Sequence, residues 1–350
     1  MPLPSMYIIQ SNHQESLPRA VASHHEIGRF KFIDLFAGIG GFRLAMQSVE
    51  GECVFSSEWN KDAQITYFEN FGDLPEGDIR SISEKDIPDH DVLCAGFPCQ
   101  PFSLAGVSAR NSLNTAHGFA CETQGTLFFD VMRIVAAKRP AVIFLENVKN
   151  LVRHDQGKTF ATIKKAIEEL GYSFSYAVIN AQAVVPQKRI RCYMVCLRDT
   201  DKKFEFPEFL GEPIPLKSIL DINVDEQFTI SDKLWAGHQR RTATNLARGT
   251  GFTAFCTDIE KPASTLVARY GKDGKECLIP QSGKNPRMLT PRECARLQGY
   301  PESFKIPVSK AAAYKQFGNS VALPVVTKIA NAIFNHLTEA NGCNSVLTKN

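Results

Sequence analysis

Several features that would define a function at once are missing from this sequence of 350 residues. Its 10 cysteines follow no regular spacing, contain no Cys-x-x-Cys pair and have no histidine pair beside them, which argues against a zinc site or a disulfide framework. No apolar run approaches the length that spans a membrane, and no internal repeat is visible. The net charge of +3 is small, so any nucleic-acid contact must come from local basic clusters. We therefore expect free thiols in a cytoplasmic protein, with no metal and no membrane.

What is present is an ordinary globular composition. Hydrophobic residues make up 43% and charged residues 22%, sufficient for a large core and two domains. Residues 1–30 show no period, and we interpret them as an N-terminal arm that is not a signal peptide. A proline-rich stretch at 204–215 indicates a domain boundary. We expect a catalytic domain at 31–205, a second domain at 206–300, and a C-terminal segment at 301–350 whose apolar stripe packs back on the first domain.

An apolar strand pattern at 32–36 runs into a glycine-rich turn, Gly38-Ile39-Gly40-Gly41, and then into an apolar-periodic helix start. Glycines let the backbone approach a ligand closely, and the helix N-terminus faces that ligand, so this unit predicts a dinucleotide-type cradle. The spacing differs from the Gly-x-Gly-x-x-Gly of a dehydrogenase. A turn that serves only packing remains the alternative.

The next strand pattern ends in Glu58-Trp59. An acidic residue after the second strand of such a unit binds a ribose hydroxyl pair, and an adjacent indole offers its face to an adenine ring. Asp78 ends a third unit, where its carboxylate is placed to accept a hydrogen bond from an adenine amino group. A surface glutamate and a core tryptophan are the alternative interpretation.

A thiol and a carboxyl group each follow a buried strand pattern. Cys99 comes after the apolar run at 91–95, and Glu146 comes after the run at 141–145. α/β proteins place their ligands at this carboxyl edge of a sheet. Taken alone, Cys99 is more simply a buried structural thiol, and Glu146 has the alternative of capping the sheet.

Two basic segments are candidates for contacts with a nucleic acid. Arg189 and Arg191 lead into a strand pattern whose alternation places them on one face, with a solvated basic edge as the alternative. The stretch 234–255 holds three arginines and no acidic residue, and with its glycines it predicts a mobile basic loop for phosphate and base contacts. Between the thiol and the next helix, residues 102–125 are nearly uncharged and typical of either a lid or a disordered segment.

Taken in order, these segments resemble the DNA cytosine-5 methyltransferases from residue 31 to about residue 334. The nucleophile motif of that family is matched by Pro-Cys-Gln at 98–100, its carboxyl motif by Glu-Asn-Val at 146–148, and its paired-arginine motif by Gln-x-Arg-x-Arg at 187–191. Further motifs match at 34–41, 58–59, 78–79, 125–128, 291–293 and 318–321. Each match is weak alone, and their common order is specific. Segments 248–252 and 264–270 are most similar to the bacterial Dcm-like branch.

The resemblance implies a fold, a cofactor and a set of site residues. The fold is α/β, a doubly wound mixed sheet of the S-adenosylmethionine-dependent methyltransferase (Rossmann-like) type with a smaller, mostly β or irregular target-recognition domain. The cofactor is S-adenosyl-L-methionine, the product S-adenosyl-L-homocysteine, and no metal is involved. The implied catalytic residues are Cys99, Glu146, Arg189 and Arg191. The implied cofactor-binding residues are Phe36, Gly38, Ile39, Gly40, Gly41, Glu58, Trp59, Asp78, Ile79, Pro98, Leu127, Asn319 and Val321. The implied DNA-binding residues are Gln100, Ser103, Arg240, Arg241, Arg248, Phe252, Thr265, Arg269 and Tyr270.

These residue types fit one reaction. A thiolate that adds to C6 of cytosine makes C5 nucleophilic, and it can leave again afterwards. Glu146, kept protonated in a dry pocket, is expected to donate to N3, while Arg189 and Arg191 hold the ring O2. Because the base is inaccessible inside a duplex, the resemblance implies that it is flipped out, with residues 102–125 closing over it and Ser103 on the phosphate backbone.

Other functions share parts of this pattern. A tRNA cytosine-5 methyltransferase has the same thiol, carboxyl and arginine motifs, and the Dcm-like recognition segment favours DNA over it. A dehydrogenase has no use for these groups, and a non-catalytic nucleic-acid binder does not need them. We expect a monomeric, cytoplasmic bacterial enzyme that acts on double-stranded DNA, associates with the nucleoid and works beside a cognate restriction endonuclease. The Dcm-like match implies a short GC-rich palindrome with a CC…GG frame as the target.

Overall fold

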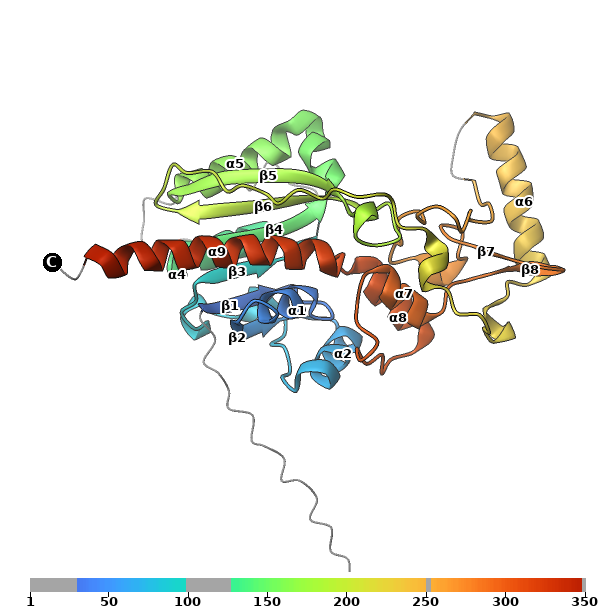
Figure 1. Cartoon of the computed structure of the whole chain (residues 1–350), viewed down its shortest axis with the longest axis horizontal. Helices are drawn as coiled ribbons and strands as arrows, with labels where there is room; N and C mark the ends of the chain where they lie inside the picture. The colour runs from blue at the N-terminus through green and yellow to red at the C-terminus, as the bar shows by residue number, and fades with distance from the viewer. Residues whose placement is uncertain (1–29, 99–126, 250–252, 348–350) are drawn as a thin grey trace, which may run out of the picture.

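A six-stranded sheet forms the centre of the computed structural model, which describes residues 30–98, 127–249 and 253–347. The strand order is β2-β1-β3-β4-β6-β5. The strands are β1 (Phe30–Leu35), β2 (Gly51–Ser57), β3 (Val92–Ala95), β4 (Val142–Val148), β5 (Tyr172–Asn180) and β6 (Ile190–Arg198). β2, β1, β3 and β4 run parallel, whereas β6 is antiparallel to both of its neighbours. The carboxyl ends of four strands therefore meet at one edge, the end of the sheet that faces α7 and α8 in Figure 1.

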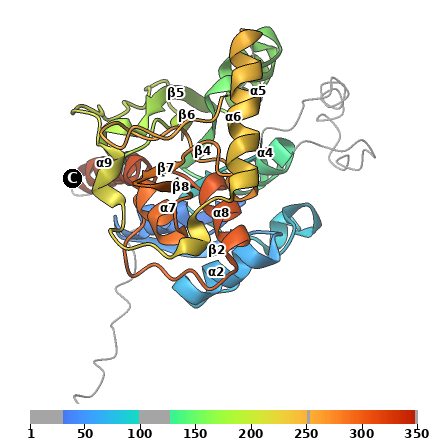
Figure 2. The same cartoon turned by 90° about the vertical axis from the view of Figure 1, so that its right-hand side faces the viewer.

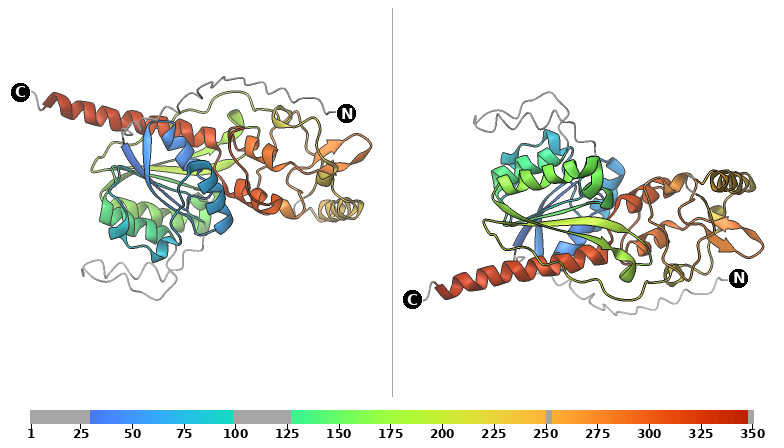
Figure 3. Two further views of the ribbon diagram at one scale, coloured as in Figure 1. Left: turned by 90° about the horizontal axis from the view of Figure 1, so that it is seen from below. Right: turned by 90° about the horizontal axis from the view of Figure 1, so that it is seen from above.

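Helices cover both faces of the sheet (Figures 1 and 3). On one face, α1 (Gly41–Gln47) and α9 (Leu323–Leu347) pack against β1, with Val325 and Ile329 in the same apolar cluster as Phe32. On the other face, α4 (Leu127–Lys138) and α5 (Lys158–Glu169) contribute Val131 and Ile163 to a second cluster. The doubly wound α/β fold that the sequence predicts is confirmed. The C-terminal apolar stripe packs back on the sheet as expected.

Local signals in the sequence account for several helix ends. α7 (Pro291–Leu297) begins with a capping box between Thr290 and Glu293, and its proline occupies the first turn. α5 is followed by Gly171, whose φ of 79° suits glycine after a helix. α2 (Lys61–Phe71) is capped by the side chain of Asn60, and α8 (Lys310–Asn319) by that of Ser309. Turn and capping residues therefore fix the boundaries that apolar periodicity leaves open.

Short 3-10 helices connect these elements. They are η1 (Ile79–Ser81), η2 (Glu84–Asp86), η4 (Lys149–Gly157), η5 (Ala181–Ala183), η6 (Leu216–Ile219), η7 (Glu226–Phe228) and η8 (Tyr270–Lys272). The expected third unit before Asp78 adds no strand to the sheet, because Glu76 forms only an isolated bridge with Ser57. Among the described residues, no single helix has the length and apolarity to cross a membrane. α8 and the first part of α9 pass that test only as a pair bent by 42°.

A third apolar cluster lies beyond the carboxyl edge of the sheet. Leu266, Tyr270 and Leu297 belong to it, and so do Ile39 and Ala63 from the sheet-bearing part, so the two parts share a core. The hairpin of β7 (Ile279–Gln281) and β8 (Lys284–Arg287) extends from this cluster. α6 (Asp232–Ala247) stands on the outer surface (Figure 2). The domain boundaries expected from the sequence stay predictions.

α6 corrects one expectation. The stretch 234–255 was expected to be a mobile loop, and its first half is a helix that starts at the Ser231 cap. Only His238 and Thr242 of this helix are buried, so it carries almost no apolar stripe. Periodicity alone could not identify such a helix. The capping serine followed by an acidic first turn was the signal available.

Candidate active site

One cavity of about 580 Å³ opens at the carboxyl edge of the sheet. Its lining comes from β1, β2, β3 and β4 or the turns after them, and from α4 and α8. The predicted cofactor residues that line it are Phe36, Gly38, Ile39, Gly41, Glu58, Trp59, Asp78, Ile79, Pro98, Leu127, Asn319 and Val321. Gly40 is not among them, because its α-hydrogen faces the ring of Phe71, and a side chain there would collide with that ring. The fold thus gathers segments from both ends of the chain around one volume of small-molecule size.

Glu58 is held firmly at the wall of this cavity. Its Oε2 accepts a hydrogen bond from the backbone N–H of Gly38 at 2.9 Å, and its Oε1 accepts one from the N–H of Asn60 at 2.7 Å. Burial raises the pKa of Glu58, and the backbone donors act in the opposite direction. Gly38 has a φ of 57°, so it reaches the carboxylate in a left-handed conformation that favours glycine. The glycine-rich turn and the acidic residue after β2 therefore form one rigid unit.

Trp59 and Asp78 stand at the rim. Trp59 is 72% exposed, which is unusual for so large an apolar ring, and it lines the cavity. The Asp78 carboxylate accepts two hydrogen bonds from Arg80 Nε, at 3.0 Å to Oδ1 and 2.9 Å to Oδ2. These bonds lower the pKa of Asp78. The alternative of a core tryptophan is wrong.

Glu146 and Arg191 meet at the inner end of the cavity. Glu146 lies near the end of β4 and lines the cavity, and Arg191 is the second residue of β6, so the antiparallel pairing of these strands brings the two side chains together. Arg191 Nε lies 3.1 Å from Glu146 Oε1. Burial raises the pKa of Glu146, and the positive charges of Arg191 and Arg189 counter that rise only in part. A buried carboxyl group thus faces the cavity with one oxygen already paired.

Asn147 ties this strand end to the segment that leads to Cys99. Its Nδ2 donates a hydrogen bond to the carbonyl of Phe97 at 2.8 Å, and its side chain is buried. Pro98, the residue bonded to Cys99, lines the same cavity as Glu146. Cys99 itself lies outside the described residues, and so do Gln100, Ser103, Phe252 and the expected lid at 102–125.

Arg189 has a different environment from Arg191. Its Nη1 donates to the carbonyl of Leu266 at 3.0 Å, and its Nη2 donates to the carbonyls of Gly318, at 3.2 Å, and Ser320. Burial and the like charge of Arg191 lower its pKa. Its terminal nitrogens are engaged by the backbone, which places Arg189 as a link between chain segments. That both arginines hold the ring O2 stays a prediction for Arg191, and the backbone contacts of Arg189 argue against that role for Arg189.

The family description of the C-5 cytosine-specific DNA methylases matches residues 30–335 of the chain. The chain belongs to this family. The type II methyltransferase M.SsoII of Shigella sonnei is 49% identical over 321 residues, covering 90% of this chain and 82% of that relative. The DNA-cytosine methyltransferase of Escherichia coli K12 is 43% identical and covers 92% of this chain and 81% of its own length. Like them, this methylase is an enzyme, a DNA (cytosine-5)-methyltransferase.

Solved structures share the fold. The Dnmt2 methyltransferase of S. pombe superposes with a TM-score of 0.70 at 19% identity, covering 89% of this chain and 99% of that structure. A putative DNA modification methyltransferase from an E. coli prophage gives a TM-score of 0.63 at 20% identity, covering 88% and 99%. The family and the fold together imply use of S-adenosylmethionine. Among its described residues, this methylase has no group of three or more His, Cys, Asp or Glu that could hold a metal ion.

The predicted DNA-binding residues of the methylase that the structure describes lie between residues 240 and 270, within residues 206–300, which we call the recognition part after its predicted role. Arg240, Arg241 and Arg248 are exposed on or just after α6, and Arg269 is half exposed. The Thr265 hydroxyl donates to the carbonyl of Lys188 at 2.5 Å. Tyr270 corrects the prediction, because it is fully buried, its hydroxyl donates to the carbonyl of Cys277, and it accepts from the N–H of Leu289.

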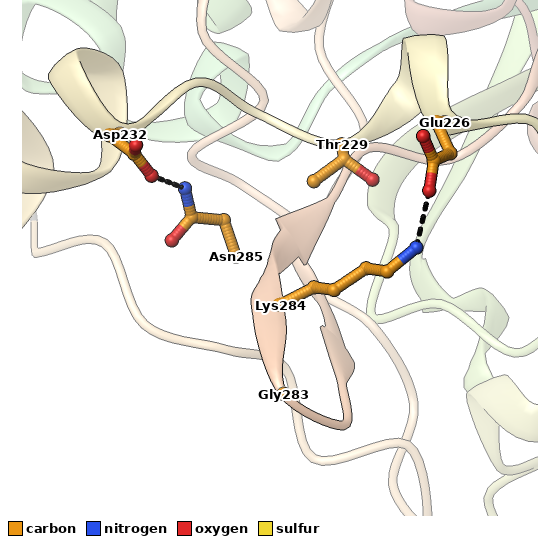
Figure 4. A pocket seen from close by; sticks show the side chains of 6 residues that line it. All are labelled: Glu226, Thr229, Asp232, Gly283, Lys284 and Asn285. Atoms are coloured by element: carbon orange, nitrogen blue, oxygen red, sulfur yellow. Dashed lines mark hydrogen bonds and ion pairs between the residues drawn. The ribbon is translucent and has the colours of Figure 1, made fainter.

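A second hollow, of about 620 Å³, lies between η7, the start of α6 and the β7–β8 turn (Figure 4). Lys284 Nζ lies 2.5 Å from Glu226 Oε1 there, and Asn285 Nδ2 donates to Asp232 Oδ1 at 2.6 Å. None of the predicted site residues lines it. Its polar groups are paired with one another, so we assign it no part in the reaction.

Sequence reasoning missed several groups at the main cavity. Ala312, Lys315 and Gln316 of α8 line it, and only the folded chain brings this helix to the first strand. The motif at 34–41 gave no separate role to Asp34. Its carboxyl group is completely buried and has no hydrogen-bond partner among the described residues, and burial raises its pKa to about 8. The nearby N–H of Arg43 lowers that pKa without reaching ordinary hydrogen-bond geometry.

Proposed function

We propose that this methylase transfers a methyl group from S-adenosyl-L-methionine to C5 of a cytosine flipped out of duplex DNA, with Cys99 as nucleophile. The observation that carries the proposal is the shared cavity. Glu146, paired with Arg191, lines the same volume as Pro98, the residue bonded to Cys99, and as the glycine-rich cradle. A donor cradle and a carboxyl group beside the thiol-bearing segment are what this chemistry requires.

The cavity fits S-adenosylmethionine in its polar and apolar parts. The Glu58 oxygens each accept one backbone hydrogen bond, which leaves each a further lone pair for a ribose hydroxyl. Trp59 exposes its ring at the rim for an adenine face, and Asp78, fixed by Arg80, is placed to accept from the adenine amino group. When bound, S-adenosylmethionine supplies an electrophilic methyl group. We assign its binding to the predicted cofactor residues other than Gly40, which supports the cradle by packing.

The thiolate of Cys99 adds to C6 of the cytosine, so the electron pair of the C5–C6 double bond becomes available at C5. C5 then takes the methyl group and loses its proton to a base, and the sulfur–C6 bond breaks to release the thiolate and restore the ring. Glu146 supplies a proton to N3 while negative charge develops in the ring, and the raised pKa of Glu146 favours this role. Arg191 positions Glu146 and holds the ring O2.

We assign double-stranded DNA as the substrate, and the family description and the name of the E. coli relative support DNA. We assign base contacts to the surface of α6 and to segment 264–269. We also propose that the enzyme modifies the site of a cognate restriction endonuclease, because M.SsoII, M1.ScrFI of Lactococcus lactis subsp. cremoris and M.NlaX of Neisseria lactamica are all named type II methyltransferases. A CC…GG-type palindrome remains our proposed target.

One experiment tests the proposal. Purified wild-type protein and Cys99→Ala are each incubated with S-adenosylmethionine and either plasmid DNA or bulk tRNA, and the product is sequenced after bisulfite treatment. We expect the wild type to protect one cytosine in a short palindrome in the plasmid and none in tRNA. We expect Cys99→Ala to bind DNA and to protect no cytosine. Protection of tRNA alone, or normal turnover by Cys99→Ala, contradicts the proposal.

A further inference from the structure

Two acidic residues with mostly buried side chains lie close to two exposed arginines of the recognition part. Arg241 comes from α6 and Arg269 from the segment before η8, and both approach Asp273, the residue that follows η8. Arg241 Nη2 lies 4.0 Å and Arg269 Nη2 3.9 Å from Asp273 Oδ2. Arg269 Nε also lies 3.8 Å from Glu276 Oε1. Asp273 therefore joins the two elements to which we assign base contacts.

The two acidic side chains are much less exposed than the two arginines. The side chains of Arg241 and Asp273 are 57% and 13% exposed, and those of Arg269 and Glu276 are 51% and 9% exposed. The separations of 3.8–4.0 Å exceed the range of about 2.7–3.2 Å for an N–H···O hydrogen bond. Asp273 Oδ1 and Glu276 Oε2 are buried without a hydrogen-bond partner among the described residues. The acids thus lie within range of charge–charge attraction to two arginines whose side chains remain more than half exposed.

His238 fixes the orientation of Arg241. Its buried ring contacts the carbonyl of Asp273 through Nε2 at 2.9 Å, and Arg241 Nη2 through Nδ1 at 3.1 Å. Arginine only donates, so Nδ1 must accept and Nε2 must carry the proton that is donated to the carbonyl. This neutral tautomer ties Arg241 to the backbone of the residue whose carboxylate lies beneath it.

We propose that Asp273 and Glu276 are positioning residues for sequence recognition: they hold Arg241 and Arg269 ready for cognate DNA and withhold their charge from other DNA. This inference rests on the proposed function. Non-specific affinity depends on the number of phosphates that basic residues neutralise, whereas base recognition depends on the direction of the donors. An acid beneath each arginine reduces the first effect and preserves the second. The net charge of the enzyme is only +3, so unmasking one arginine should change its non-specific affinity for DNA measurably.

The test compares Asp273→Asn and Glu276→Gln with the control Glu226→Gln. The control removes the same charge from the recognition part, at the ion pair of Glu226 with Lys284 (Figure 4), which includes neither arginine. Each protein is titrated with a labelled duplex that lacks methylation sites, at several salt concentrations. We expect Asp273→Asn to bind this duplex about tenfold more tightly at low salt, with a salt slope steeper by about one. We expect a smaller change for Glu276→Gln and none for the control.

Two further measurements distinguish unmasked arginine charge from a general loosening of the fold. The double variant Asp273→Asn/Arg241→Gln should recover the wild-type salt slope, which mere loosening of the fold would not do. Bisulfite sequencing of a methylated plasmid should show more modification at near-cognate sites for Asp273→Asn than for wild type. Wild-type affinity and slope in both single variants overturn the inference. A wild type that methylates no DNA overturns the proposed function instead, and the binding titrations still decide the inference.

Discussion

The carboxyl edge of the sheet and the recognition part differ in what holds their polar side chains in position. At the sheet edge, the backbone of the strand ends fixes where Glu58 and Glu146 lie, and a single cavity collects them. In the recognition part, α6 has almost no buried face, and its arginines are placed by long ion pairs and one histidine. Under the proposed function, the reacting groups lie at the strand ends of the sheet, whereas sequence specificity belongs to a surface that can vary at little cost to the core.

Glu146→Gln tests the chemical side of this comparison and should have the largest effect. The amide keeps the shape and the contact with Arg191 but has no acidic proton to give to N3. We expect kcat to fall by roughly 10²–10⁴-fold. DNA affinity should stay within about twofold, because general acid catalysis acts on the step and not on duplex binding. Single-turnover kinetics with a binding titration measures both, and equal losses in rate and affinity would indicate a structural role.

Gly318→Ala tests the contact between the two regions, where α8 packs against the backbone of Val267 and Ala268. A Cβ at Gly318 would collide with the backbone of Val267 and Ala268, which cannot move aside as a flexible side chain can. We expect a loss of about 1–3 kcal/mol in the free energy of unfolding, as for other overpacked sites. Gly237→Ala is the matched control, because a Cβ there meets nothing within 4 Å and alanine favours the helix. Urea unfolding measures the stability of both variants. Equal stability would show that the contact at Gly318 has room for a side chain.

Asp34→Asn tests the burial of a carboxyl group at the sheet edge through the pH dependence of folding stability. The pKa of Asp34 is about 8 in the folded chain and about 4 when unfolded, so between these values the folded state keeps a proton that the unfolded state releases. Stability from this group is therefore full below about pH 4 and is lost as the pH rises towards 8. We expect the wild type to lose about 1–3 kcal/mol more than Asp34→Asn between pH 6 and pH 8.5. Parallel stability curves would contradict the assignment, and Asp89→Asn, whose side chain is 94% exposed, is the control.

Trp59→Ala should have the smallest effect. Its exposed ring contributes only a stacking face, worth about 0.5–1.5 kcal/mol, so KM for S-adenosylmethionine should rise about 3–10-fold with kcat unchanged. Phe68→Ala removes an exposed ring of α2 that does not line the cavity and should leave KM unchanged. Initial rates at varied cofactor concentration measure both variants, and an unchanged KM for Trp59→Ala would remove it from the site.

The sequence predicts the sheet edge well, for a physical reason. Apolar runs that end in Gly38, Glu58 or Glu146 predict both a buried strand and the residue at its end, and parallel strands bring those ends together. The contribution of α8 could not be predicted, since no local pattern indicates which strand a distant helix covers. In the recognition part, the resemblance implies DNA contacts for Tyr270 and for the α6 arginines alike. Burial then separated them, and burial there depends on long-range packing around residues such as Leu289.

The central claim is that Cys99 bonds to the target cytosine in the course of methyl transfer. The most direct measurement is mass spectrometry of the protein after incubation with S-adenosylmethionine and a cognate duplex that carries 5-fluorocytosine at the target position. Because fluorine cannot leave as a proton does, the account predicts a stable protein–DNA adduct, mapped by proteolysis to the peptide that contains Cys99. Methylation of the ordinary duplex with no adduct on the fluorinated one, or an adduct at another residue, would contradict it.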